Sequence, residues 1–218
     1  MAIRNVVFDL GGVLIEWDPR RLYRTIFDDE EAMDRFLTEV CTQEWNAEQD
    51  AGRPWDDAVA TLTQQFPEFS AEIAAYRDRW TEMLGGPIQP TVQILAALRD
   101  AGTRLFALSN WSKDTFAVAR RMPEYAFLDW FEGIVISGEE RLCKPDPRIF
   151  RALLDRYRLR PGETLFIDDS SENVAAARNL GLAGVRFADA STLADALRGH
   201  GLLDSRGPIP AAQPGSMG

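Results

Sequence analysis

Four short segments of the sequence carry side chains that could take part in catalysis. Each comes where a stretch of apolar residues typical of a buried strand ends. The segments are Asp9-Leu10-Gly11-Gly12-Val13, Ser109-Asn110, Lys144-Pro145 and Asp168-Asp169. Each alone fits an ordinary structural role, such as a helix cap, a solvated charge or a turn. Together they predict a polar site, because the carboxyl ends of parallel strands meet at one edge of a sheet.

Three of these side chains, Asp9, Asp168 and Asp169, would crowd their carboxylates together at this edge. A pair of like charges about 4 Å apart costs roughly 4 kcal/mol at an effective dielectric of about 20, so a positive group must lie among them. A hard divalent cation meets this need. Mg²⁺ is the natural candidate, because it accepts one or two carboxylates and keeps waters that a phosphate can displace. Lys144 would add a further fixed positive charge.

The elements that must position these residues alternate between strands and helices. Apolar runs typical of strands cover 5–8, 104–108, 134–136, 164–167 and 184–187. Helical spacing of apolar residues covers 91–101, 147–157 and 171–180. This alternation predicts an α/β fold with a doubly wound parallel sheet and helices on both of its faces.

A second, smaller unit interrupts the alternation early in the chain. Residues 17–86 contain no convincing strand, and helices are expected over 31–40, 55–65 and 70–84. We therefore expect a core domain made of residues 1–16 and 87–204, with an inserted all-helical cap domain of residues 17–86 placed over the ligand-binding edge of the sheet. Residues 205–218 are rich in Gly, Pro, Ala and Ser, which predicts a disordered tail.

Composition excludes several classes of function. The 24 Lys and Arg residues against 34 Asp and Glu residues give a net charge of −10, which disfavours nucleic acid as a partner. No apolar run approaches the roughly 18 residues that cross a membrane. A single histidine, His200, disfavours Ser-His catalysis and multi-histidine metal sites. Cys41 and Cys143 form no metal-ligand pattern and are expected to be reduced thiols in a cytoplasmic protein, either monomeric or a homodimer.

The four segments resemble the ordered motifs of the haloacid dehalogenase superfamily. The matching stretches are Phe8-Asp9-Leu10-Gly11-Gly12-Val13-Leu14, Leu108-Ser109-Asn110, Lys144-Pro145-Asp146 and Phe166-Ile167-Asp168-Asp169. Their order, spacing and strand contexts all agree with the superfamily pattern. The resemblance extends over about residues 4–203, and the insertion is similar to the helical cap of its phosphatases and dehalogenases.

The resemblance implies a role for each matching residue. Asp9 would be the nucleophile that forms an aspartyl-phosphate, and Lys144 would orient it and compensate the charge of the transition state. Ser109, with Asn110 and the backbone N–H groups around Gly12, would hold the phosphoryl oxygens. Mg²⁺ would be bound by Asp9, Asp169 and the backbone carbonyl of Gly11, with Asp168 as an outer or water-mediated ligand.

Position 11 departs from the usual phosphatase pattern. A second aspartate usually stands there as general acid and base, and glycine cannot carry a proton. Without this proton carrier the rate would be about 10²- to 10⁴-fold lower, unless a water, a cap residue, Glu16 or Asp18 transfers the proton instead. Some phosphatase-like members of the superfamily are similar to this sequence in having glycine at that position.

The dehalogenase branch also lacks the second aspartate, because a leaving halide needs no proton. A metal-independent 2-haloacid dehalogenase with Asp9 as nucleophile, forming an ester intermediate, is therefore the main alternative. The pair Asp168-Asp169 argues against it, since a metal-free site for an anionic haloacid gains nothing from extra negative charge. The favoured prediction is a Mg²⁺-dependent phosphomonoester hydrolase acting on a small phosphorylated metabolite. A non-catalytic binding protein on the same fold is a third possibility.

Substrate recognition is assigned to the cap. Aromatic and cationic residues there could contact a sugar or a carboxylate, and Thr42 to Arg53 is the expected specificity loop. Trp111 is expected either to wall the pocket or to pack under the cap. The candidate cap residues are Trp17, Arg20, Arg21, Trp45, Gln49 and Arg53, of which Arg20, Trp45 and Arg53 are the predicted substrate contacts.

Overall fold

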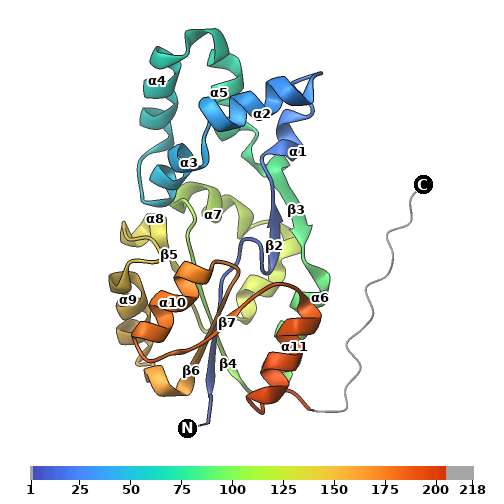
Figure 1. The fold of residues 1–218 in the computed structure, drawn as a ribbon, viewed down its shortest axis with the longest axis vertical. Coiled ribbons are helices and arrows are strands. Elements are labelled where there is room, and N and C mark those ends of the chain that lie inside the picture. The colour runs from blue at the N-terminus through green and yellow to red at the C-terminus, as the bar shows by residue number, and fades with distance from the viewer. Residues whose placement is uncertain (1, 205–218) are drawn as a thin grey trace, which may run out of the picture.

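The structure, a computed structural model, describes residues 2–204 and contains a five-stranded parallel sheet (Figure 1). The strand order is β5-β4-β1-β6-β7. The bounds are β1 Asn5–Phe8, β4 Arg104–Ser109, β5 Gly133–Ile136, β6 Thr164–Asp168 and β7 Ala183–Arg186. The predicted doubly wound α/β fold is confirmed. The predicted tail, 205–218, lies outside the described residues.

Helices cover both faces of the sheet because its central strands are apolar on both sides. Alternate residues of β1 point to opposite faces: Val6 and Phe8 pack into one buried cluster, and Val7 packs into the other. The first cluster is closed by α6 (Gln89–Asp100) and α11 (Ala190–Gly199). The second is closed by α9 (Pro147–Tyr157) and α10 (Ser171–Asn179). Shorter helical segments connect the strands: α7 Lys113–Ala119, η3 Pro123–Trp130, α8 Ser137–Glu140 and η4 Pro161–Glu163.

A helical module lies beyond the carboxyl ends of the strands, at the top of Figure 1. Its own core is largely aromatic, with Tyr23 against Phe36 at a centroid distance of 4.9 Å and Trp45 edge-on to Tyr76 at 5.1 Å. The module consists of α1 Arg20–Tyr23, α2 Glu30–Glu39, α3 Gln43–Asp50, α4 Trp55–Gln65, η1 Pro67–Phe69, α5 Ser70–Asp78 and η2 Trp80–Met83.

Two expectations for this module are corrected. The helix expected over 70–84 ends at Asp78, and Leu84–Pro87 forms a strand, β3, that pairs antiparallel with β2 (Ile15–Trp17). The expected specificity loop 42–53 is mostly helical, because the Thr42 hydroxyl accepts the backbone N–H of Trp45 and caps α3. The β2–β3 ribbon spans both predicted domain boundaries, so the division at residues 17 and 86 stays a prediction.

Within residues 2–204, the helices are too short or too polar to cross a membrane.

Candidate active site

Asp9 follows β1 directly and is the centre of a buried polar cluster. Its side chain is nearly buried, with the residue 8% exposed. The Oδ1 atom accepts the backbone N–H of Leu10 and the hydroxyl of Ser109, each at 2.7 Å, and lies 2.9 Å from the Lys144 ammonium. Among the described residues, no hydrogen bond or ion pair reaches Oδ2. One carboxylate oxygen is thus held by three donors, while the other has no contact of this kind among the described residues.

Lys144 joins Asp9 to Asp168. Its ammonium is 2.6 Å from Asp168 Oδ2, and its side chain is 1% exposed. Burial acts to lower the pKa of Lys144, but the two carboxylates together raise it above its ordinary value. Burial raises the pKa of Asp9, while the Lys144 charge opposes that shift. The ammonium is therefore held in its charged form beside the Asp9 carboxylate.

Asn110 positions this lysine through the backbone. Its side-chain Nδ2 donates to the carbonyl of Lys144 at 3.0 Å, and its Oδ1 accepts the N–H of the same residue at 2.8 Å. The amide therefore fixes the backbone of Lys144, and its expected contact with phosphoryl oxygens stays a prediction.

Asp168 is fully buried and its carboxylate is saturated with donors. Oδ1 accepts the backbone N–H of Ser170 at 2.8 Å and Nδ2 of Asn173 at 3.0 Å, while Oδ2 bonds Lys144. Few lone pairs remain for a metal, so the structure supports an outer position for Asp168. Asn173 was not among the predicted site residues, because an asparagine in the first turn of a helix carries no distinctive signal.

The residues present fit a divalent cation. Asp9, Asp168 and Asp169 each place a carboxylate oxygen within 4.8 Å of the others. Asp169 is exposed to the cavity, but partial loss of water around its carboxylate and the nearby charge of Asp168 raise its pKa. Hydrogen bonds flank Gly11 on both sides, from Ile15 N–H to Leu10 carbonyl at 2.9 Å and from Gly12 N–H to Ile15 carbonyl at 3.0 Å. The Gly11 carbonyl therefore points away from this ladder and has no hydrogen-bond donor among the described residues.

Gly12 and Gly11 differ in what they tolerate. Gly12 has φ +71°, and a Cβ there would lie 2.6 Å from Asp169 Oδ2, so glycine lets the loop approach the carboxylate. Its N–H donates to Ile15, which corrects the expected contact of this amide with substrate. A Cβ on Gly11 would meet nothing within 4 Å.

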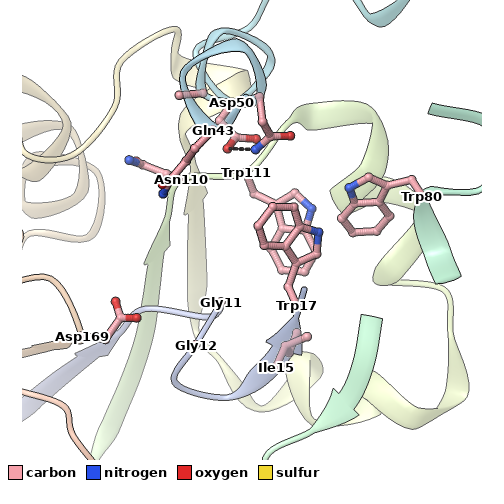
Figure 2. A pocket seen from close by; sticks show the side chains of 12 residues that line it. Gly11, Gly12, Ile15, Trp17, Gln43, Asp50, Trp80, Asn110, Trp111 and Asp169 are labelled. Atoms are coloured by element: carbon pink, nitrogen blue, oxygen red, sulfur yellow. Dashed lines mark hydrogen bonds between the residues drawn. The ribbon is translucent and has the colours of Figure 1, made fainter. Parts of the chain in front are cut away.

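A cavity of about 360 Å³ opens beside this cluster, between the sheet edge and the helical module (Figure 2). Gly11, Gly12 and Asp169 form its floor in the view of Figure 2. Part of the lining is aromatic, and part of it, from α3 and Asn110, is polar. The aromatic lining residues are Trp17, Trp80 and Trp111, and the polar ones include Gln43, Asn46, Asp50 and Asn110.

Three predicted substrate contacts lie outside this cavity, which corrects their assignment. Arg20 is paired with Asp34 on the surface, with Nη2 to Oδ1 at 3.0 Å. Arg53 is paired with Glu48. Trp45 packs in the aromatic core of the module.

Other sequence candidates are also accounted for. Glu16 is half-exposed and lies 3.6 Å from Arg21, and the Asp18 carboxylate accepts the backbone N–H of Arg20 at the start of α1. Gln49 is buried, and its amide donates to the Trp45 carbonyl. Trp17 and Trp111 do line the cavity.

The fold is an α/β sheet with a helical module beyond the carboxyl ends of its strands, and the polar cluster is centred on an aspartate that follows the first strand. The family model of haloacid dehalogenase-like hydrolases matches residues 3–181. The chain therefore belongs to the haloacid dehalogenase-like hydrolases.

Individual relatives include both phosphatases and dehalogenases. The chain is 29% identical to sesquiterpene phosphatase astK of Aspergillus oryzae, covering 86% of this chain and 91% of the relative. A magnesium complex of a HAD family enzyme from Bacteroides thetaiotaomicron has a TM-score of 0.67 at 25% identity, covering 86% of this chain and 94% of that one. L-2-haloacid dehalogenase from Xanthobacter autotrophicus has a TM-score of 0.61 at 21% identity, covering 90% and 83%, which shows a shared fold.

Proposed function

We propose that this protein is a Mg²⁺-dependent phosphatase that hydrolyses a small phosphate monoester through an aspartyl-phosphate on Asp9. The observation that carries the proposal is the arrangement around Asp9: a carboxylate held on one oxygen by Ser109 and Lys144, next to Asp168 and Asp169. Asp169 and the loop residues Gly11 and Gly12 connect this cluster to the cavity that they line. The similarity to a phosphatase over 86% of the chain supports the proposal.

The reaction proceeds by in-line attack of an Asp9 carboxylate oxygen on phosphorus. Lys144 compensates the charge that the carboxylate and the phosphoryl group share, and Asp168 and Asn110 hold Lys144 in place. Ser109 keeps Asp9 oriented and can turn its hydroxyl to a phosphoryl oxygen. Water then hydrolyses the aspartyl-phosphate to release inorganic phosphate.

Asp9, Asp169 and the Gly11 carbonyl are the groups that would hold Mg²⁺. The ion supplies positive charge that balances the clustered carboxylates and the phosphoryl oxygens. The substrate that binds in the cavity is a small phosphorylated metabolite.

The cysteines support a location for the protein. Cys41 and Cys143 are free thiols, which supports a reducing, cytoplasmic location.

The second candidate function is a 2-haloacid dehalogenase. Gly11 favours it, because glycine carries no proton and a leaving halide needs none. The saturated Asp168 and the exposed Asp169 count against it, because they add negative charge beside the binding place of an anionic substrate. Lys144 is engaged by both Asp9 and Asp168 and leaves little positive charge for a carboxylate substrate.

Two assays separate the candidates. We expect hydrolysis of p-nitrophenyl phosphate with Mg²⁺, its loss with a chelator, and its loss in Asp9→Asn. Asp146→Asn is a matched control, because this carboxylate caps α9 and bonds Arg148 on the surface. Chloride release from 2-chloropropionate in the presence of a chelator, without phosphatase activity, would establish the dehalogenase instead. Neither activity, with no Mg²⁺ binding, would point to a binding protein.

A further inference from the structure

Asp50 is the acidic residue of the helical module that lines the cavity beside the Asp9 cluster. It lies near the C-terminal end of α3 and lines the cavity together with Gly11, Asn110 and Asp169 (Figure 2). The other acidic residue lining that cavity is Asp169, which is assigned to the metal. Glu16 and Asp18 are engaged elsewhere, as described above.

The position of Asp50 is set by contacts with both parts of the molecule. Its Oδ2 accepts Nδ2 of Asn46 at 3.1 Å within α3. Its backbone carbonyl accepts the hydroxyl of Ser137 at 2.6 Å, and that same hydroxyl oxygen accepts the N–H of Trp111 at 2.9 Å. The backbone N–H of Ser112 is directed at the Asp50 carboxyl. Asp50 is thereby tied to the loop that begins just after Ser109.

The electrostatic surroundings allow this carboxyl both to hold and to release a proton near neutral pH. Burial raises the pKa of Asp50 to about 7, and the N–H of Ser112 only partly opposes this shift. The ionisable groups that face it are Tyr76 of α5, Cys143 and, across the cavity, Asp169. Burial raises the pKa of both Tyr76 and Cys143 above their ordinary values, so both are neutral near pH 7. No lysine or arginine of the described chain lines the cavity to hold Asp50 ionised.

We propose that Asp50 is the general acid and base of the reaction, replacing the proton carrier that Gly11 cannot provide. The inference rests on the phosphatase proposed above. In the first step Asp9 forms a bond to phosphorus, the bond from phosphorus to the leaving oxygen breaks, and Asp50 gives its proton to that oxygen. In the second step the Asp50 carboxylate takes a proton from a water molecule, the water oxygen forms a bond to phosphorus, the bond from phosphorus to the Asp9 oxygen breaks, and inorganic phosphate leaves.

The test compares two substrates of similar shape that differ in their need for a proton. p-Nitrophenyl phosphate releases a stable phenolate, whereas benzyl phosphate releases a poor leaving group. Asp50→Asn should lower kcat/KM for benzyl phosphate about 10²-fold more than for p-nitrophenyl phosphate. In the wild-type protein the kcat/KM for benzyl phosphate divided by that for p-nitrophenyl phosphate should fall above about pH 7, because Asp50 then loses the proton that benzyl phosphate needs. In Asp50→Asn this ratio should be independent of pH.

Glu48→Gln is the matched control, since it makes the same change on the same helix at a surface carboxylate paired with Arg53. Thermal unfolding of Asp50→Asn verifies that the variant is folded. An equal loss on both substrates, or the wild-type pH dependence of the ratio in Asp50→Asn, would overturn the role of Asp50. Absence of p-nitrophenyl phosphate hydrolysis by the wild-type protein would instead refute the phosphatase itself.

Discussion

The adjacent glycines of the first loop should respond in opposite ways to the same substitution. Gly12 has φ +71°, a region that costs a residue with a Cβ about 1–2 kcal/mol. In a chain of this size each kcal/mol lowers Tm by about 2–4 °C. Gly12→Ala should therefore lower Tm by about 2–8 °C. Gly11 does not have a positive φ and has open space at its Cβ position, so Gly11→Ala should leave Tm unchanged or slightly raised.

The substitution at Gly12 should also disturb the metal site. The new Cβ would lie 2.6 Å from Asp169 Oδ2, closer than two such atoms can approach, so the carboxylate must move. Displacing one of the groups that hold the ion should raise the Mg²⁺ concentration for half-maximal turnover by roughly 10- to 100-fold. Nothing at Gly11 requires such a movement, so Gly11→Ala should keep the wild-type Mg²⁺ requirement.

Differential scanning fluorimetry and a Mg²⁺ titration of p-nitrophenyl phosphate hydrolysis measure both effects on the same samples. If Gly12→Ala matched Gly11→Ala in Tm and in Mg²⁺ requirement, the loop conformation and the placement of Asp169 would both be refuted. A lower Tm with an unchanged Mg²⁺ requirement would refute the assignment of Asp169 as a metal ligand alone.

Three further predictions concern the charged and proton-carrying groups of the site. Lys144→Met should reduce the free energy of unfolding by about 3–5 kcal/mol, because Asp9 and Asp168 lose their counter-ion, and a loss below about 1 kcal/mol in urea titrations would contradict this. Gly11→Asp should restore at least about tenfold of the benzyl phosphate activity lost in Asp50→Asn, measured as kcat/KM of the double variant, since it returns a proton carrier to the loop. Burial raises the pKa of Asp50 to about 7, so the folded protein binds a proton that the unfolded chain has released, and stability should fall by on the order of 1–3 kcal/mol as pH rises from about 5 to 8. Asp50→Asn should lose the part of this dependence that comes from Asp50, while the raised pKa of Asp9 leaves a smaller one. Thermal unfolding of both proteins at the two pH values measures the difference, and an equal dependence in both would contradict the raised pKa of Asp50.

The sheet and the four motif segments could be predicted because their signals are local. Each strand is a short apolar run, and Asp9, Ser109 and Asp168 stand where a strand ends. The identity of the reactive edge then follows from the geometry of parallel sheets. The role of Asn110 could not be derived in this way, because its commitment to the Lys144 backbone depends on a loop 34 residues away.

The β2–β3 ribbon was missed for a different reason. β3 is Leu-Gly-Gly-Pro, a composition that favours a turn, and its pairing with β2 comes from tertiary contact. The cationic cap residues were misassigned because an arginine on an acidic protein finds a carboxylate partner at the surface, as Arg20 and Arg53 do. Surface pairing of this kind has no sequence signal that separates it from substrate binding.

Asp50 shows why the chemistry of the cap could not be derived from spacing. The sequence pointed to the segment around α3 for substrate recognition but not to Asp50, whose position at the cavity arises only when the helix meets the core. The Ser137 hydroxyl bonds both the Asp50 carbonyl and the backbone of Trp111, so the contact that attaches α3 to the core is also the contact that aims its carboxyl at the cavity. Proton transfer and attachment of the cap therefore depend on the same few atoms, and a change that loosens this contact should impair the reaction of poor leaving groups before that of good ones.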